Sequence, residues 1–396
     1  MSPIASRPQA APPAVTALLP IMAVVFFVYL VIGLAMPVLP LHVHQGLGLS
    51  TFVVGLVAGS QFAAALISRP WAGHYADRRG AKRAVVAGLL VAVATGLAYL
   101  LSLRFAAAPE TSVTILIVGR ALLGIGESFI ITGALSWGLA LMGPQNTGKV
   151  MSWIGTALYA AYAVGAPAGT ALYAGHGFAA IALATMLVPL ATLALVVPLR
   201  PVPAQPQARV SLTRVVGAVW VPGLALAISG VGFGAVTTFI ALLFAERGWQ
   251  PIWLAFTALS VAFMVGRLLF GHLPDRIGGA KVALVCVLIE AMGQALIWLA
   301  PSSVVAMLGV TLTGAGYSLV YPGFGVEAIR RAPPQSRGLA MGAYTAFLDL
   351  SLGLSGPVLG LVAGGAGLGA VFLASTLAVL CSAAVAIRLL VAPSPA

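Results

Sequence analysis

Twelve long apolar segments divide this chain of 396 residues. They cover residues 17–39, 51–74, 84–103, 112–141, 148–174, 177–199, 214–244, 251–273, 282–300, 303–328, 338–364 and 367–391. A membrane-spanning helix needs about 20 predominantly apolar residues, and each segment is long enough. Only 7% of the residues are charged, against about 25% in soluble domains. The sequence therefore predicts an all-α membrane protein with twelve transmembrane helices and excludes a soluble enzyme.

The basic residues collect in alternate loops. If the N-terminus is cytoplasmic, fifteen of the 20 Lys and Arg residues fall on the cytoplasmic side, and only Arg104 and Arg247 fall outside. This asymmetry follows the positive-inside rule, so both termini are predicted to be cytoplasmic. The net charge of +12 is then a topology signal, and we expect no nucleic-acid partner.

A polar stretch separates six spans from six. Residues 200–213 are too polar for hydrocarbon and are predicted to form a cytoplasmic linker between an N-terminal bundle, 17–199, and a C-terminal bundle, 214–391. The Pro- and Ala-rich residues 1–16 are expected to be a disordered cytoplasmic tail, and 392–396 a second tail. No disulfide is expected, because both cysteines lie inside apolar segments.

The two halves repeat each other. GHYADRRGAKR at 73–83 recurs as GHLPDRIGGAKV at 271–282, and Arg69 recurs as Arg267, at an offset of 198 residues. PQNTGKVM at 144–151 recurs as PQSRGLAM at 334–341, with Pro167 matched by Pro357, at an offset of 190. Two matches between corresponding loops indicate a parallel duplication.

These residues resemble the major facilitator superfamily. The loop at 73–83 is similar to its signature between the second and third spans, and Arg120 with Gly124 is similar to its fourth-span motif. Gly165, Pro167 and Gly169 resemble the motif of its antiporters. The segments 68–73, 119–128 and 347–353 resemble the bacterial arabinose-efflux-like group of drug and metabolite exporters. The resemblance implies two pseudo-symmetric six-helix bundles, alternating access and a location in the bacterial inner membrane.

The repeated loop is a candidate conformational latch. Gly73 and Gly80 are expected to bracket a tight reversal that a side chain would obstruct, and Asp77 can face the positive end of a neighbouring helix. The resemblance implies that Asp77 latches the bundles on the cytoplasmic side when the cavity faces outward. The alternative is that these charges only anchor the topology. The complete candidate set is Gly73, Asp77, Arg78, Gly80, Lys82, Gly271, Asp275 and Arg276.

Ionisable residues inside spans are costly and are functional candidates by default. Arg120, Glu127, Glu290 and Asp349 lie in mid-span, whereas Arg69 and Arg267 lie near cytoplasmic ends and can snorkel. Arg120 and Glu127 share a helical face about 10 Å apart and are not expected to pair. One arginine cannot neutralise three carboxyl groups. At least one of them is therefore expected to be protonated near neutral pH.

The surplus of carboxyl groups over arginines in mid-span points to proton coupling. A carboxyl group that is neutral when buried and ionised when hydrated links proton occupancy to the side on which the cavity is open. Glu127 is the first candidate, since by resemblance the fourth span lines the cavity, and its alternative role is a structural hydrogen bond between helices. Asp349 follows, with structural pairing as an equal alternative. Glu290 is the third, and for it a structural role is the favoured interpretation. Arg120 is expected to tune the acid or to hold an anionic substrate. The candidate cavity wall, whose alternative role is packing, is Tyr29, Gln61, Trp137, Tyr159, Tyr162, Phe233, Tyr317 and Tyr321.

No HExxH, GxxxxGK[ST] or GxSxG motif occurs, so no enzyme, cofactor or metal centre is predicted. His42 and His44 are expected to be solvated in the first outer loop.

The predicted function is export of a small, partly apolar solute, drug or metabolite by proton antiport, with protons and membrane lipids as the other partners of a monomer. The alternatives are proton-coupled uptake, a lipid flippase and a non-transporting receptor.

Overall fold

The computed structural model describes residues 14–143, 146–202, 212–332 and 337–391. The predicted tails therefore lie outside the described residues, apart from the start of the first helix, and so does most of the predicted linker. The first helix begins at Ala14 and the seventh span at Leu212, two to three residues earlier than the sequence predicts.

The N-terminal half consists of helices and one short π-helical segment. They are α1 (Ala14–Ala35), α2 (Leu39–Leu41), η1 (His42–Gly46), α3 (Thr51–Arg79), α4 (Ala81–Leu103), α5 (Pro109–Met142) and α6 (Thr147–Val196). The last of these bends at Gly177, whose backbone is non-helical with a φ of 64°. Glycine tolerates this conformation, so α6 supplies both the fifth and the sixth predicted spans.

The C-terminal half has the same plan. Its helices are α7 (Leu212–Glu246), α8 (Ile252–Phe270), α9 (Leu273–Ile277), α10 (Gly279–Leu299), α11 (Ser303–Tyr317), α12 (Val320–Arg331), α13 (Arg337–Ala366) and α14 (Leu368–Val391). In the described residues, eleven apolar helical stretches are long enough to cross a membrane, and one of them, Lys149–Val196, contains the bend at Gly177. The prediction of an all-α, twelve-span protein is confirmed.

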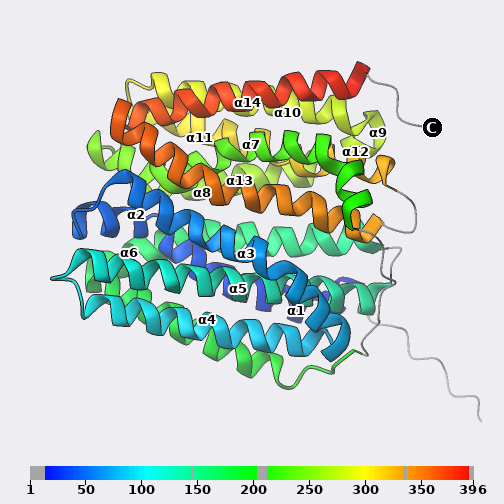
Figure 1. Cartoon of the computed structure of the whole chain (residues 1–396), viewed down its shortest axis with the longest axis horizontal. Coiled ribbons are helices and arrows are strands. Elements are labelled where there is room, and N and C mark those ends of the chain that lie inside the picture. Colours follow the sequence, from blue (N-terminus) through cyan, green and yellow to red (C-terminus); the bar gives the residue numbers. More distant parts are fainter. Residues whose placement is uncertain (1–13, 144–145, 203–211, 333–336, 392–396) are drawn as a thin grey trace, which may run out of the picture.

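The helices form two bundles whose long axes run in a common direction (Figure 1). Within each bundle, glycines let helix backbones approach closely. Gly124 of α5 packs on the backbone of Gln61 of α3, and Gly314 of α11 packs on the backbone of Leu259 of α8. These pairs are related by the same offsets, 190 and 198 residues, that relate the loop motifs. The duplication read from the loops is therefore repeated in the packing of the helices.

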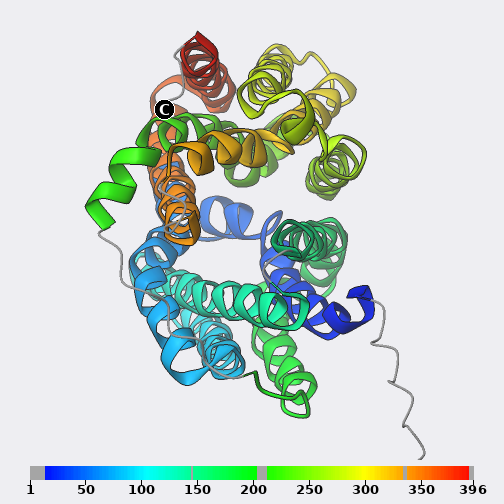
Figure 2. The same cartoon turned by 90° about the vertical axis from the view of Figure 1, so that its right-hand side faces the viewer.

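Two seams join the bundles, as the view along the helices shows (Figure 2). In the α3–α13 seam, Gly55 faces the backbone of Gly356, and the Thr51 hydroxyl donates to the carbonyl of Gly360 at 2.8 Å. In the α6–α8 seam, the Thr257 hydroxyl donates to the carbonyl of Ala163 at 2.9 Å. The glycine contacts of the α3–α13 seam lie at the end of the molecule opposite the basic loops.

The basic loops differ from the expectation in one respect. Gly73 does not bracket a reversal: it lies inside α3, and a Cβ atom there would meet no neighbour within 4 Å. The turn falls at Gly80 alone, with a φ of 90°, and at its counterpart Gly278, with a φ of 102°. These dihedrals belong to a region that is essentially restricted to glycine, so the turn needs a single glycine in each copy.

His42 also differs from its expected solvated position. Its side chain is buried and stacks on the ring of Phe178, with centroids 4.0 Å apart and planes inclined by 2°. The reason is that the chain after α1 continues as α2 and η1 instead of an open loop, and so turns His42 toward α6.

Candidate coupling and substrate site between the bundles

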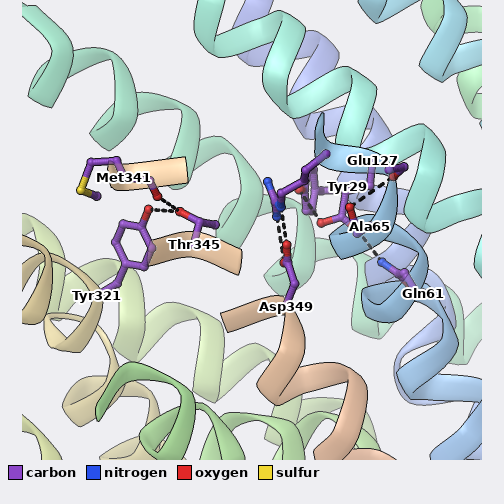
Figure 3. Close-up of polar contacts among 10 residues, drawn as sticks. Tyr29, Gln61, Ala65, Glu127, Tyr321, Met341, Thr345 and Asp349 are labelled. Carbon is purple, nitrogen blue, oxygen red and sulfur yellow. Dashed lines mark hydrogen bonds and ion pairs between the residues drawn. The ribbon is translucent and has the colours of Figure 1, made fainter. Parts of the chain in front are cut away.

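Glu127 lies on α5 and is held by two uncharged donors (Figure 3). The Tyr29 hydroxyl donates to its Oε1 at 2.8 Å, and the Gln61 amide donates to its Oε2 at 2.6 Å. Among the described residues Glu127 forms no ion pair, and it is half-buried. Sequence reasoning proposed all three residues, and the structure brings them together.

Asp349 is paired across the α3–α13 seam. Arg69 donates from Nη2 to Oδ1 at 2.8 Å and from Nε to Oδ2, and Figure 3 shows Asp349 pointing toward the N-terminal bundle. The exposed fractions of the two side chains are 23% and 6%. The expectation that Arg69 snorkels to the cytoplasmic surface is wrong, because its guanidinium group turns inward to a carboxyl 280 residues away in sequence. Of the three acids for which the sequence predicts too few cations, Asp349 therefore has a cationic partner.

Glu290 lies inside the C-terminal bundle, away from both seams. Its side chain is completely buried on α10; Oε2 accepts from the Ser229 hydroxyl, and Oε1 has no hydrogen-bond partner among the described residues. The neighbouring amide of Gln294 donates to the carbonyl of Gly232 at 3.0 Å and to Thr313 at 3.2 Å. Glu290 therefore belongs to a polar cluster within one bundle.

The aromatic candidates form a chain of rings that crosses the α6–α8 seam. Tyr159 stacks on Phe263, with centroids 3.6 Å apart, and Phe233 stacks on Tyr317 at 5.1 Å. Tyr162 links Tyr29 to Tyr159, at 5.8 Å from each. Offset and tilted ring pairs of this kind stabilise each other by about 0.5–1.5 kcal/mol beyond their burial. The sequence reading missed Phe263, although its spacing of four from Arg267 places both on one helical face.

The remaining cavity candidates are not members of this chain of rings. The Tyr321 hydroxyl is 2.7 Å from that of Thr345, and the Tyr321 carbonyl accepts from the hydroxyl of Tyr344. Neither Thr345 nor Tyr344 was proposed from the sequence. Trp137 is buried among apolar side chains of the N-terminal bundle, including Val150, so it packs instead of lining the space between the bundles.

Arg120 borders a small, partly open cavity of about 50 Å³. Tyr162 and Phe233 line the same cavity, and the phenol of Tyr99 lies beside the guanidinium group. The side chain is only 6% exposed, its Nε has no hydrogen-bond partner, and it forms no ion pair in the described part of the chain. As the sequence predicts, Arg120 and Glu127 do not pair.

The antiporter-like motif packs α6 against α1. A Cβ atom at Gly165 would clash with the backbone of Gly33, and one at Gly169 with the backbone of Leu34. Pro167 lies between them inside α6. The two glycines therefore set how closely the helices approach.

Among the residues that the structure describes, the latch candidates form no ion pair or hydrogen bond across the bundles in this conformation. Asp77 makes no ion pair or hydrogen bond with a described residue, while Arg78, Asp275 and Arg276 are exposed. Lys82 instead donates to the carbonyls of Val197 and Leu199, at 2.7 Å each, and ties the start of α4 to the end of α6. Gly271 follows α8 directly.

Known proteins resemble this chain along most of its length. The model of the Major Facilitator Superfamily matches residues 21–273 and 223–396. The uncharacterized MFS-type transporter STM4428 of Salmonella typhimurium is 44% identical, with 92% of this chain and 94% of that protein covered. The uncharacterized MFS-type transporter YhhS of Escherichia coli K12 is 43% identical, with 88% and 86% covered.

Solved structures share the fold at low sequence identity. An inward-facing bacterial homolog of the human lysosomal transporter Spinster has a TM-score of 0.76 at 14% identity, covering 96% of this chain and 98% of that one. The human organic anion transporter MFSD10 has a TM-score of 0.72 at 15% identity, covering 95% and 100%. With the predicted resemblance, the repeated loops and the paired bundles in agreement, the chain belongs to the major facilitator superfamily and is an MFS-type integral membrane transporter.

Proposed function

We propose that this transporter exports a small, partly apolar organic solute in exchange for protons, and that Glu127 carries the proton. The proposal places the basic loops and both termini on the cytoplasmic side of a bacterial inner membrane, following the positive-inside rule. The observation that carries it is the setting of Glu127. The carboxyl group is held by the neutral donors Tyr29 and Gln61 and forms no ion pair with any residue that the structure describes.

The neighbours of Glu127 supply a coupling mechanism. The ionisable groups that interact with it are Arg69, Asp349 and the phenols of Tyr29 and Tyr162. In this conformation Arg69 is bound to Asp349. A neutral Glu127 is compatible with that pairing, because it makes no demand on the guanidinium group.

Loss of the proton changes the balance. An ionised Glu127 competes with Asp349 for Arg69, and any movement of Arg69 toward α5 weakens the only ion pair between the bundles in the described residues. A group whose protonation differs between two conformations biases the equilibrium between them. We therefore expect proton release from Glu127 to favour separation of the α3–α13 seam. Asp77 and the other latch residues would then engage at the basic end.

Proton movement in proteoliposomes tests this function. Purified protein is reconstituted with an internal pH dye, and amino acids, sugars and drugs are added one at a time to the outside. Antiport predicts that an entering solute drives protons outward, so the interior becomes alkaline. Glu127→Gln should abolish this signal, whereas Glu110→Gln, a change at the start of α5, should preserve it. Acidification that accompanies solute entry would instead establish the uptake mechanism, and solute flux without proton movement would reject coupling.

A further inference from the structure

We infer that the α6–α8 seam binds an anionic group of the substrate at Arg267, so that the transported solutes include organic acids that join a carboxylate to an apolar body. This inference rests on the proposed function, in that the solute is taken to be small and organic. It concerns what is bound and not how transport is driven.

The internal repeat defines what is missing at Arg267. Arg69 of α3 and Arg267 of α8 occupy equivalent positions, 198 residues apart. The second offset, 190 residues, makes Tyr159 of α6 the equivalent of Asp349 of α13. Each arginine faces the equivalent helix across a seam: Arg69 reaches Asp349, and Arg267 lies against α6 beside Gly155. One seam therefore contains an arginine and an acid, whereas the other contains an arginine and a phenol.

No side chain of the protein neutralises Arg267. All eight Asp and Glu residues fall within the described part of the chain, and none forms an ion pair with Arg267. Its ionisable neighbours are the phenols of Tyr159 and Tyr321, and its guanidinium carbon lies 6.0 Å from the ring centre of Phe263. A partly buried cation without a counter-ion pays for desolvation without an offsetting attraction. An anion that enters the seam provides that attraction.

The surroundings favour a carboxylate with an apolar body. A guanidinium group presents parallel N–H donors that match the two oxygens of a carboxylate. From Arg267 the rings of Phe263 and Tyr159, followed by Phe233 and Tyr317, lead away into the protein. Aromatic or aliphatic carbons attached to the carboxylate can pack on these rings. The guanidinium group of Arg267 packs on α6 at Gly155, where an added Cβ atom would lie 3.2 Å from Nη1. The guanidinium group therefore points into the seam.

Matched acids and amides test the charge requirement. Thermal unfolding of the full-length protein in a neutral detergent is measured with benzoate and benzamide, phenylacetate and phenylacetamide, and hexanoate and hexanamide. At least one acid should raise Tm by about 2 °C at ten times its Kd, and its amide should not. Loss of one charge-assisted interaction in Arg267→Gln should weaken binding of that acid by about 10- to 100-fold. Arg104→Gln, a change of an exposed arginine that directly follows α4, should leave the response unchanged.

Tyr159 provides a second test that does not require the loss of Arg267. Tyr159→Asp reproduces the acid of the other seam and should form an internal pair with Arg267 that excludes the ligand. Tyr159→Asn removes the same ring but adds no charge. We expect the Asp variant to lose the acid-induced rise in Tm and the Asn variant to retain part of it, while without ligand the Asp variant should be the more stable of the two.

Several results would overturn the inference. They are equal stabilisation by acids and amides, an acid response that survives Arg267→Gln, and a panel in which no acid raises Tm. Stabilisation by phosphatidylglycerol micelles that depends on Arg267, without a response to any soluble acid, would assign the site to a lipid headgroup instead. Binding is measured without a membrane or a gradient. A failure of proton coupling therefore leaves this test intact, and a failure of acid binding leaves the proton test intact.

Discussion

Arg69 on α3 and Asp349 on α13 form the only ion pair that joins the two bundles in the described part of the chain. The pair lies between the glycine contacts of the seam, which end near Gly59 and Gly353, and the basic end of the molecule. The helices α3 and α13 belong to different halves of the duplication, so the Arg69–Asp349 ion pair exists only while this seam is closed. It can therefore report on the conformational equilibrium as well as on stability.

Breaking this pair on one side should destabilise the protein. Asp349→Asn leaves Arg69 without a counter-ion and should cost about 1–3 kcal/mol, less than for a fully buried pair because Arg69 is 23% exposed. Thermal unfolding in detergent measures the effect. The double variant with Arg69→Gln should be less destabilised than the sum of the single changes. Arg330→Gln, which removes a 54% exposed partner of Glu327, serves as the control, and strictly additive effects at Arg69 and Asp349 would contradict a direct pairing.

The two glycines of the basic loop should respond differently to the same change. Gly80→Ala forces a Cβ atom onto a backbone with a φ of 90° and should cost about 1–3 kcal/mol. Gly73→Ala adds a methyl group inside a helix where nothing lies within 4 Å, and alanine is the better helix former. Thermal unfolding should therefore rank Gly73→Ala at or above the wild-type protein and Gly80→Ala below it. The reverse ranking would instead support the prediction that Gly73 is part of the tight reversal.

Sequence reasoning predicted the spans, the duplication and Glu127 as a candidate, because each leaves a local signal. Apolar runs reveal the spans, and an acid inside such a run is conspicuous. Tyr29 and Gln61 were proposed only as cavity residues, since no periodicity tells which side chains of different helices face one another.

The cross-bundle contacts left no such signal. Arg69 lies near the end of its helix, where snorkelling is the usual behaviour, and its partner is 280 residues away. Phe263 is one of many aromatic residues in apolar segments, and its role depends on the approach of α6 to α8. His42 was misplaced because the sequence gives no sign that the first loop continues as α2 and η1. These are consequences of tertiary packing, which local patterns do not encode.

Locking the α3–α13 seam should stop transport. Ala63→Cys with Gly353→Cys, in a background with Cys286→Ser and Cys381→Ser, should form a disulfide across the seam, because a Cβ atom at Gly353 would lie 3.7 Å from the Cβ atom of Ala63. Oxidation should reduce flux in proteoliposomes to less than about one tenth, since alternating access requires the bundles to separate, and a reductant should restore it.

The control for this cross-link lies within one bundle. A Cβ atom at Gly230 of α7 would lie 3.5 Å from the Cβ atom of Ser351 of α13, within the range of disulfides, so Gly230→Cys with Ser351→Cys joins two helices of the C-terminal bundle. Its oxidation should leave flux unchanged. Full activity of the oxidised Ala63 and Gly353 variant would show that this seam stays closed throughout the transport cycle.

Replacement of Glu290 should separate burial from coupling. Glu290→Gln keeps an acceptor for the Ser229 hydroxyl in a site that contains no other charge, so the variant should fold. Its rate of solute-driven proton movement should stay within about twofold of wild type, as expected for a residue without a role in the transport step. Glu290→Leu leaves that buried hydroxyl without its acceptor and should lower stability by about 1–3 kcal/mol. The comparison that decides is with Glu127→Gln, measured in the same proteoliposomes. If Glu290→Gln is folded and loses proton movement while Glu127→Gln retains it, the proton is carried inside the C-terminal bundle and not between the bundles.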